Sequence, residues 1–108
     1  MSQQTALLRI YTDEAAYFGE RKLFEVIARR AREARLAGAT VLRALLGFGH
    51  TPHLHVHHML DDDQSIVIEV VDAEEKLRAF AASLADMGDI GLITLEKVEV
   101  LRPSEFAR

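Results

Sequence analysis

The side chains best suited to chemistry are five histidines, all within the stretch GFGHTPHLHVHHM at residues 47–59. Neutral imidazole binds transition metals, and an ordinary pKa near ~6.5 lets histidine change charge around neutral pH. If the stretch is a strand, His53, His55 and His57 fall on one face. Alternate strand residues lie roughly 7 Å apart, so two of these imidazoles can share one ion, whereas a third lies too far away.

Three interpretations of these histidines remain open. In the first, a pair, His53 with His55, binds a divalent metal with help from His50, Asp61, Asp62 or a second copy of the chain. Alternatively, the histidines give a partner-docking loop a charge that varies with pH. The third interpretation is an exposed hairpin whose imidazoles pair with acidic residues.

Catalysis finds little support in the sequence. There is no cysteine, which excludes thiolate catalysis, disulfides and cysteine-bound zinc. No Ser-His-Asp arrangement stands in a recognisable context, no Walker-type phosphate loop is present, and no paired carboxylates suggest an acid and a base. We therefore expect a protein that is not an enzyme and requires no cofactor.

Two glycine-containing segments form a second group of candidates: GFG at residues 47–49 and GDIG at residues 88–91. Glycine permits positive φ and close approach to a ligand, and the exposed amides of such turns bind phosphate. Turn geometry accounts for the same glycines without any ligand. The elements that surround the two segments therefore decide between ligand binding and simple turn geometry.

Composition limits the protein class. With 108 residues, 28% of them charged, and a net charge of −4, the chain is expected to form a single domain over residues 1–108. The negative charge argues against nucleic-acid binding. No apolar run reaches the ~20 residues of a membrane helix, and no secretory signal precedes residue 12. We expect a cytoplasmic protein with no membrane insertion.

Hydrophobic periodicity predicts the elements that would position these segments. Strands are expected over residues 6–12, 39–46, 65–71 and 93–100, with further alternation over 53–60 and a loop over 13–20. A phase slip near Glu96 suggests a β-bulge or two strand pieces. One amphipathic helix is expected to end at Gly38. A second is expected to begin at a capping box of Asp72 and Glu75 and to end at Gly88.

The order strand-helix-strand, twice over, predicts an α+β fold. We expect a ferredoxin-like βαββαβ sandwich, in which an antiparallel four-stranded sheet carries both helices on one face. The other sheet face would then expose apolar residues such as Leu42, Val67 and Val71. An uncovered apolar face in a small domain favours an oligomer.

The order of several short motifs carries a resemblance to a known family. The pieces GATV (38–41), GFG (47–49), VIEVVD (67–72), GDIG (88–91) and ITLEKVEV (93–100) resemble PII-type signalling proteins. LRIYTDE, AGATVLR, GFG and VIEVVDAEEK resemble more closely the short PII-like branch filed as a domain of unknown function. The resemblance runs from about Leu7 to Arg102. It implies a ferredoxin-like homotrimer that binds an adenine nucleotide in clefts between subunits.

The resemblance also implies the binding residues. Thr40 lies in the G-x-T-V context that contacts adenine in PII proteins, although this chain has one extra residue between Thr40 and the GFG. The remaining implied residues are Gly47, Phe48, Gly49 and His50 in the first segment, Gly88, Asp89, Ile90 and Gly91 in the second, and Arg102 near the C-terminal end.

Departures from the PII pattern refine the expected ligand. Leu92 follows the GDIG segment where PII proteins usually have a lysine, and Arg102 is the one arginine near the end of the matching region. Because fewer cations would neutralise a triphosphate poorly, AMP or ADP is favoured over ATP. The mobile loop, residues 47–64, is expected to signal to a protein partner, for example a membrane transporter. The alternatives are a metal-binding trimer and an oligomeric adaptor without a small ligand.

Overall fold

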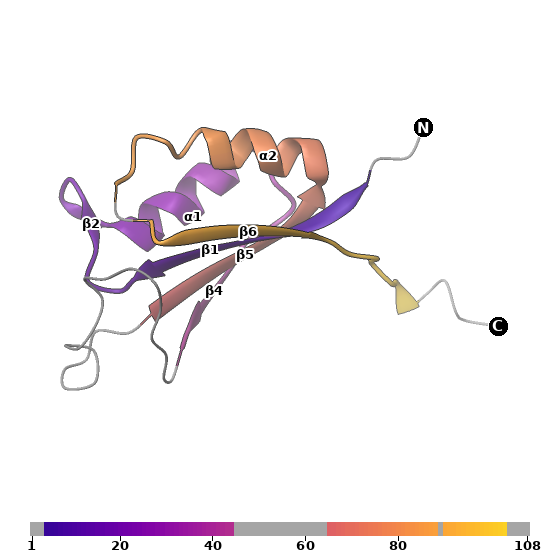
Figure 1. Ribbon diagram of the computed structural model, residues 1–108, viewed down its shortest axis with the longest axis horizontal. Coiled ribbons are helices and arrows are strands. Elements are labelled where there is room, and N and C mark those ends of the chain that lie inside the picture. Colours follow the sequence, from indigo (N-terminus) through magenta and orange to yellow (C-terminus); the bar gives the residue numbers. More distant parts are fainter. Residues whose placement is uncertain (1–3, 45–64, 89, 104–108) are drawn as a thin grey trace.

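The computed structural model describes residues 4–44, 65–88 and 90–103 (Figure 1). In chain order its elements are β1 (Thr5–Asp13), β2 (Tyr17–Phe18), β3 (Arg21–Lys22), α1 (Leu23–Glu33), β4 (Thr40–Arg43), β5 (Ser65–Ala73), α2 (Glu74–Ala82) and β6 (Leu92–Lys97). Strands β2 and β3 form a small hairpin, of which β2 lies in the segment expected to be a loop and β3 follows directly after it. Its Gly19 has a φ of +66°, a conformation that glycine adopts without steric cost.

The main sheet is antiparallel and has the strand order β4-β5-β1-β6. Both helices lie on one face of it, and the other face carries no element of the described chain (Figure 1). The predicted ferredoxin-like βαββαβ sandwich is therefore confirmed. The long strands β1 and β5 occupy the centre, and the shorter β4 and β6 form the two edges.

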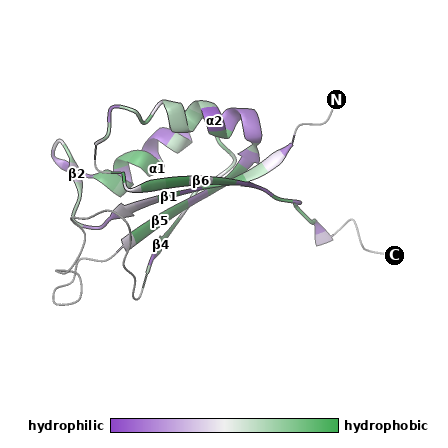
Figure 2. Ribbon diagram, viewed as in Figure 1, coloured by the Kyte–Doolittle hydropathy of each residue, from purple (hydrophilic) through white to green (hydrophobic). Residues whose placement is uncertain are grey.

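The core fills the layer between sheet and helices. Alternate strand residues point towards the helices, as the period of two in a strand requires. The buried apolar side chains come from β1 (Ala6, Leu8, Ile10), β5 (Ile66, Ile68, Val70), α1 with its following turn (Leu23, Ile27, Ala31, Leu36), and α2 with its following turn (Leu77, Phe80, Leu84, Met87). Figure 2 shows that β5 and β6 are largely apolar along their length.

The prediction that the first helix, α1, ends at Gly38 was wrong. Arg35, not Gly38, takes the left-handed conformation, with φ of 63°. The Leu36 N–H donates to the Ala31 carbonyl at 3.1 Å, and the Arg35 N–H donates to the Arg32 carbonyl at 3.0 Å. These two hydrogen bonds form a Schellman motif. Burial of Leu36 in the core fixes where the chain turns, so the helix ends well before Gly38.

The predicted capping box of α2 was also wrong. Ala73 is the N-cap residue, and no side chain caps this end. The Asp72 carboxylate instead accepts hydrogen bonds from the Ala37 N–H at 2.8 Å and the Ala73 N–H at 2.6 Å. Asp72 thus connects the end of β5 to the segment that leads into β4. The helix ends at Ala82, and turns rather than helix continue towards Met87.

The last strand, β6, is regular. The sequence had suggested either a β-bulge or two strand pieces near Glu96. Its ladder with β1 runs without interruption from Leu92 opposite Tyr11 to Lys97 opposite Ala6. The change of hydrophobic phase coincides with the end of the strand, because Val98 makes one more hydrogen bond, to Thr5, and lies beyond the assigned strand. The alternation expected over residues 53–60 lies outside the described residues.

Candidate functional site

The sheet face away from the helices, termed here the open face, is organised in rows that cross the strands. One apolar row joins Leu42, Val67, Tyr11 and Leu92 across all four strands. A second row joins Val71, Leu7 and Glu96. Leu42, Val71 and Leu92 are 44%, 38% and 49% exposed. The predicted apolar face is therefore present, and the described part of the chain leaves it open to solvent.

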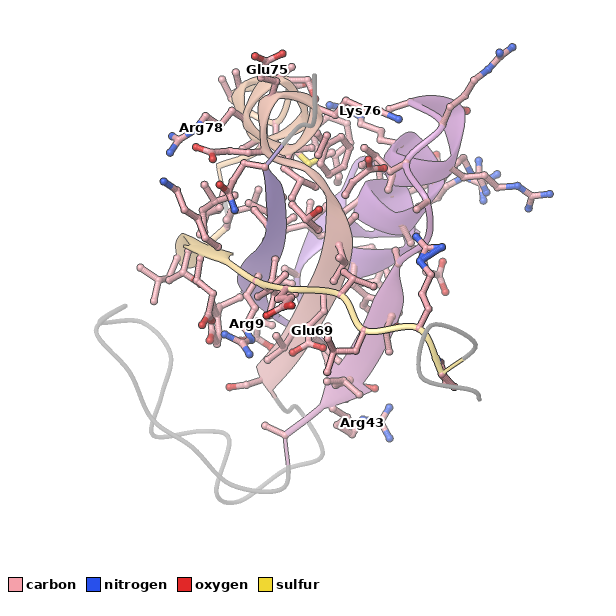
Figure 3. The ribbon with its side chains drawn as sticks, turned by 90° about the vertical axis from the view of Figure 1, so that its right-hand side faces the viewer. Arg9, Arg43, Glu69, Glu75, Lys76 and Arg78 are labelled. Carbon is pink, nitrogen blue, oxygen red and sulfur yellow. The ribbon has the colours of Figure 1, made fainter. Side chains whose placement is uncertain are left out.

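A polar row separates the two apolar rows. It runs from Thr40 on β4 through Glu69 and Arg9 to Thr94 on β6. Arg9 Nε donates to Glu69 Oε2 at 3.0 Å, and Arg9 Nη1 donates to Glu96 Oε1 at 2.9 Å. Figure 3 shows Arg9 and Glu69 together on the side of the sheet away from the helices. The hydrogen bonds that Arg9 donates to Glu69 and Glu96 raise the pKa of its guanidinium.

The described residues next to the two glycine-containing segments lie at one end of the sheet, at its opposite edges. The Ala44 N–H, at the end of β4, donates to the Ser65 carbonyl, and the Gly91 N–H, just before β6, donates to the Tyr11 carbonyl. Ser65 pairs with Asp13 at that end. Three inter-strand steps separate β4 from β6, or roughly 14 Å at ~4.8 Å a step. Ala44, the last described residue before the first segment, and Gly91 of the second segment therefore lie at opposite edges of the sheet in one chain.

The remaining described candidates are also dispersed over the single chain. Thr40 is exposed on the β4 edge, beside Glu69. Gly88, Ile90 and Gly91 lie in the connection to β6 on the other edge. Arg102 is exposed and follows Lys97, which pairs with Ala6 at the opposite end of β1. A site that uses all of these residues has to be completed by another copy of the chain.

The other candidates lie outside the described residues. These are Gly47, Phe48, Gly49, His50 and Asp89 of the nucleotide proposal, and His53 and His55 of the metal proposal. Within residues 4–44, 65–88 and 90–103, no group of three or more His, Asp or Glu side chains is arranged to hold a metal ion. The metal interpretation of the histidines remains a prediction.

The sequence interpretation missed the Arg9 network. Glu69 is a charged residue inside the apolar run of β5, and that run alone does not reveal its partner. Arg9 occupies the same kind of position in β1, between buried Leu8 and Ile10. Opposite charges on the exposed phase of two apolar strands are a signal for a cross-strand pair. Using that signal requires the register, which places Arg9 opposite Glu69.

The fold and the open face define the class: an α+β protein with a ferredoxin-like sandwich and one uncovered sheet surface. The DUF190 family, described as "Uncharacterized ACR, COG1993", matches residues 5–100. A curated relative, a UPF0166 protein of Aquifex aeolicus (strain VF5), is 39% identical over 97 residues, which cover 88% of this chain and 91% of the relative. This protein belongs to the DUF190 family.

Solved structures with PII-like folds resemble this chain along nearly its whole length. CPII of Thiomonas intermedia K12, solved with ADP, AMP and acetate, has a TM-score of 0.65 and 20% identity, covering 98% of each chain. The same protein with ADP and bicarbonate has a TM-score of 0.67 and 21% identity, covering 95% of this chain and 94% of CPII. A Thermus thermophilus protein described as a PII-like signalling protein has a TM-score of 0.63 and 16% identity, covering 99% of this chain and 100% of its own. These likenesses establish the PII-like fold.

Neither of the two helices in the described part of the chain is long and apolar enough to cross a bilayer.

Proposed function

We propose that this protein is a non-enzymatic PII-like regulator, a homotrimer that binds an adenine nucleotide in clefts between subunits. The whole chain, residues 1–108, acts as one PII-like domain in this proposal. Its ligand is AMP or ADP, and residues 47–64 form the loop that communicates with a protein partner. The nucleotides that accompany CPII, a protein of similar fold, support the choice of ligand.

The observation that supports the proposal is the placement of Ala44 and Gly91 at opposite edges of one end of the sheet, where each makes a backbone hydrogen bond to the neighbouring strand. If copies associate side by side, the β4 edge of one copy can meet the β6 edge of the next. The cleft between them would then be lined by residues 47–49 of one chain and residues 88–91 of its neighbour.

The charges near the proposed cleft favour a short phosphate chain. Leu92 is apolar and 49% exposed at the position that follows the second segment. Arg102 is exposed and would reach the cleft from a neighbouring copy. One arginine and backbone amides suffice for one or two phosphates, whereas a triphosphate carries more charge than they would neutralise.

Signalling would follow from the position of the loop between β4 and β5. Arg43 Nη2 donates to Glu14 Oε2 at 2.5 Å, which connects the end of β4 to the residue that follows β1. A nucleotide bound at residues 47–49 would bias the loop towards one arrangement, and a partner such as a membrane transporter would then bind that arrangement preferentially.

The test is calorimetric titration of the protein with AMP, ADP, ATP and cyclic AMP. We expect heat and saturation with AMP or ADP and weaker binding of ATP. The substitution Thr40→Val removes one hydroxyl. It should weaken nucleotide binding roughly fivefold to tenfold, the effect of one hydrogen bond. Arg102→Gln should weaken it roughly tenfold or more, because it removes a charge-assisted contact to phosphate.

A matched control comes from α1. Arg29 is exposed on this helix, on the other side of the sheet from the open face, and Arg29→Gln should leave the affinity unchanged. Absence of heat and of any thermal shift with all four nucleotides would refute the nucleotide proposal. Equal losses in Arg29→Gln and Arg102→Gln would refute the assignment of Arg102.

A further inference from the structure

Three parts of the chain that are distant in sequence meet at the side chain of Arg30 on α1. Its Nη1 donates to the Ser83 carbonyl at 3.2 Å and to Asp86 Oδ1 at 3.0 Å, and its Nη2 donates to Asp86 Oδ2 at 3.0 Å. The Arg30 Cζ lies 5.3 Å from the centre of the Phe18 ring on β2. Arg30 therefore connects α1 and β2 to the segment that leads from α2 to β6 (Figure 1).

The contact between Arg30 and Asp86 is directional. Two hydrogen bonds to both oxygens of one carboxylate fix it relative to the guanidinium plane, which the single ammonium group of a lysine cannot do. The Phe18 ring restricts that plane further. The side chains of Arg30 and Asp86 are 28% and 55% exposed, and ion pairs this open to water add little to global stability. Its larger effect is therefore expected to be on local orientation.

The residues directly after Asp86 have few other directional contacts. Gly88 and Ile90 make no backbone hydrogen bond to another described residue, and the next such bond runs from the Gly91 N–H to a carbonyl of β1 at 2.9 Å. Met87 is buried in the core and Ile90 packs partly buried against it, but apolar contacts are not directional. Among the described residues, Asp86 is the last hydrogen-bonded side chain before β6.

We propose that Arg30 is a positioning residue for Gly88 and Gly91, whose backbone amides it holds in one orientation through Asp86. The inference rests on the proposed function for what this orientation serves, which is contact between these amides and a phosphate group. Amides that are ordered before the ligand arrives spare the binding step the entropy of ordering them. Arg30 itself contacts no nucleotide in this proposal.

Paired substitutions test whether Arg30 acts through Asp86. Arg30→Gln removes the two-pronged contact, and Asp86→Asn removes the charge that accepts it. If the two residues act through each other, the double variant should lose no more than either single variant. Arg30→Lys keeps the charge without the two-pronged geometry and should restore only part of the loss. The matched control is Arg78→Gln, because Arg78 makes an exposed ion pair with Glu74 within α2.

The experiment combines two measurements at a temperature where every variant is folded. The first is amide hydrogen exchange followed by nuclear magnetic resonance, without nucleotide. Arg30→Gln should raise the exchange rates of the Met87 and Gly91 amides roughly fivefold and leave those of β1 and β5 unchanged. The second is calorimetric titration with ADP, in which Arg30→Gln should weaken binding roughly threefold to fivefold. Arg78→Gln should change neither.

Three results would overturn the inference. Exchange at Met87 and Gly91 could equal that in Arg78→Gln, or it could rise together with exchange in β1 and β5, which would indicate a purely stabilising contact. The third result is a local rise in exchange with unchanged affinity for ADP.

Two further outcomes are also decisive. If the natural chain binds no nucleotide, the proposed function fails, and the exchange rates alone decide whether Arg30 positions the segment. If Arg30→Gln does not fold by circular dichroism, Asp86→Asn decides, because the Asp86 side chain is 55% exposed and its replacement spares the core.

Discussion

Asp72 connects two parts of the fold that are distant in sequence, so its removal should be costly. Its carboxylate accepts from the Ala37 N–H at 2.8 Å and the Ala73 N–H at 2.6 Å, and it lies 3.5 Å from Lys76 Nζ. The side chain is only 14% exposed. Burial alone would raise the pKa of Asp72, but the two backbone N–H groups and Lys76 outweigh burial and lower it.

The magnitude follows from these contacts. A hydrogen bond to a charged group contributes ~1.5–3 kcal/mol, and a partly exposed ion pair such as the one with Lys76 contributes at most ~1 kcal/mol. Water can reach the Ala37 N–H after truncation, because Ala37 is exposed. We therefore expect Asp72→Ala to lower the free energy of unfolding by about 2 kcal/mol at pH 7, and Asp72→Asn by about 1 kcal/mol.

The loss of unfolding free energy caused by replacing Asp72 should depend on pH, and the direction of that dependence follows from the lowered pKa. Because the folded-state pKa of Asp72 lies below the ordinary value of 3.8, ionisation stabilises the fold fully above that value. The stabilisation falls as the pH drops below 3.8 and is lost once the pH passes the lowered folded-state pKa. The difference between the natural chain and Asp72→Asn should therefore be constant from pH 7 to 5 and shrink towards pH 3.

Urea denaturation followed by circular dichroism measures this difference. All variants should be compared at one protein concentration, because association also contributes to stability. Glu75→Gln is the matched control, since Glu75 is exposed and would matter only if the expected capping box existed. A deficit for Asp72→Asn below about 0.3 kcal/mol, or one that does not shrink in acid, would refute the reasoning.

Three glycine-related substitutions test the turns. Arg35→Gly should raise the free energy of unfolding by about 1 kcal/mol, because a non-glycine residue with φ of 63° is strained. Gly38→Ala should not destabilise, since Gly38 lacks a positive φ and nothing lies within 4 Å of an added Cβ; a loss of about 1 kcal/mol would restore Gly38 as the helix cap. Gly19→Ala should lower the free energy by about 1 kcal/mol, because Gly19 has a φ of +66° in the β2–β3 turn. Thermal and urea unfolding of the three variants would check all of these values.

The sequence predicted the fold where local pattern and packing agree. The apolar runs of β1 and β5, rich in β-branched residues, and the helical spacing of Leu23 and Ile27 identified the elements, and their order implied the sheet. The end of α1 was misjudged because Leu36, by packing into the core, determines the turn, and glycine preference is weaker than that burial. Asp72 was misassigned because a capping box considers only neighbours in sequence.

Less of the candidate site could be predicted. The placement of Ala44 and Gly91 at opposite edges of the sheet follows from strand order rather than from any motif. Arg9 illustrates the same limit, because its partners Glu69 and Glu96 lie 60 and 87 residues away. Cross-strand pairs become visible only when the register is known.

The placement of Thr40 and Gly91 at opposite edges has a genetic consequence. If each cleft takes one edge from each of two copies, a chain defective at Thr40 still carries an intact β6 edge, and a chain defective at Gly91 still carries an intact β4 edge. Mixed oligomers of the two would contain some clefts with both edges intact. Two inactive alleles should therefore complement each other when expressed together, whereas either allele alone should not restore binding.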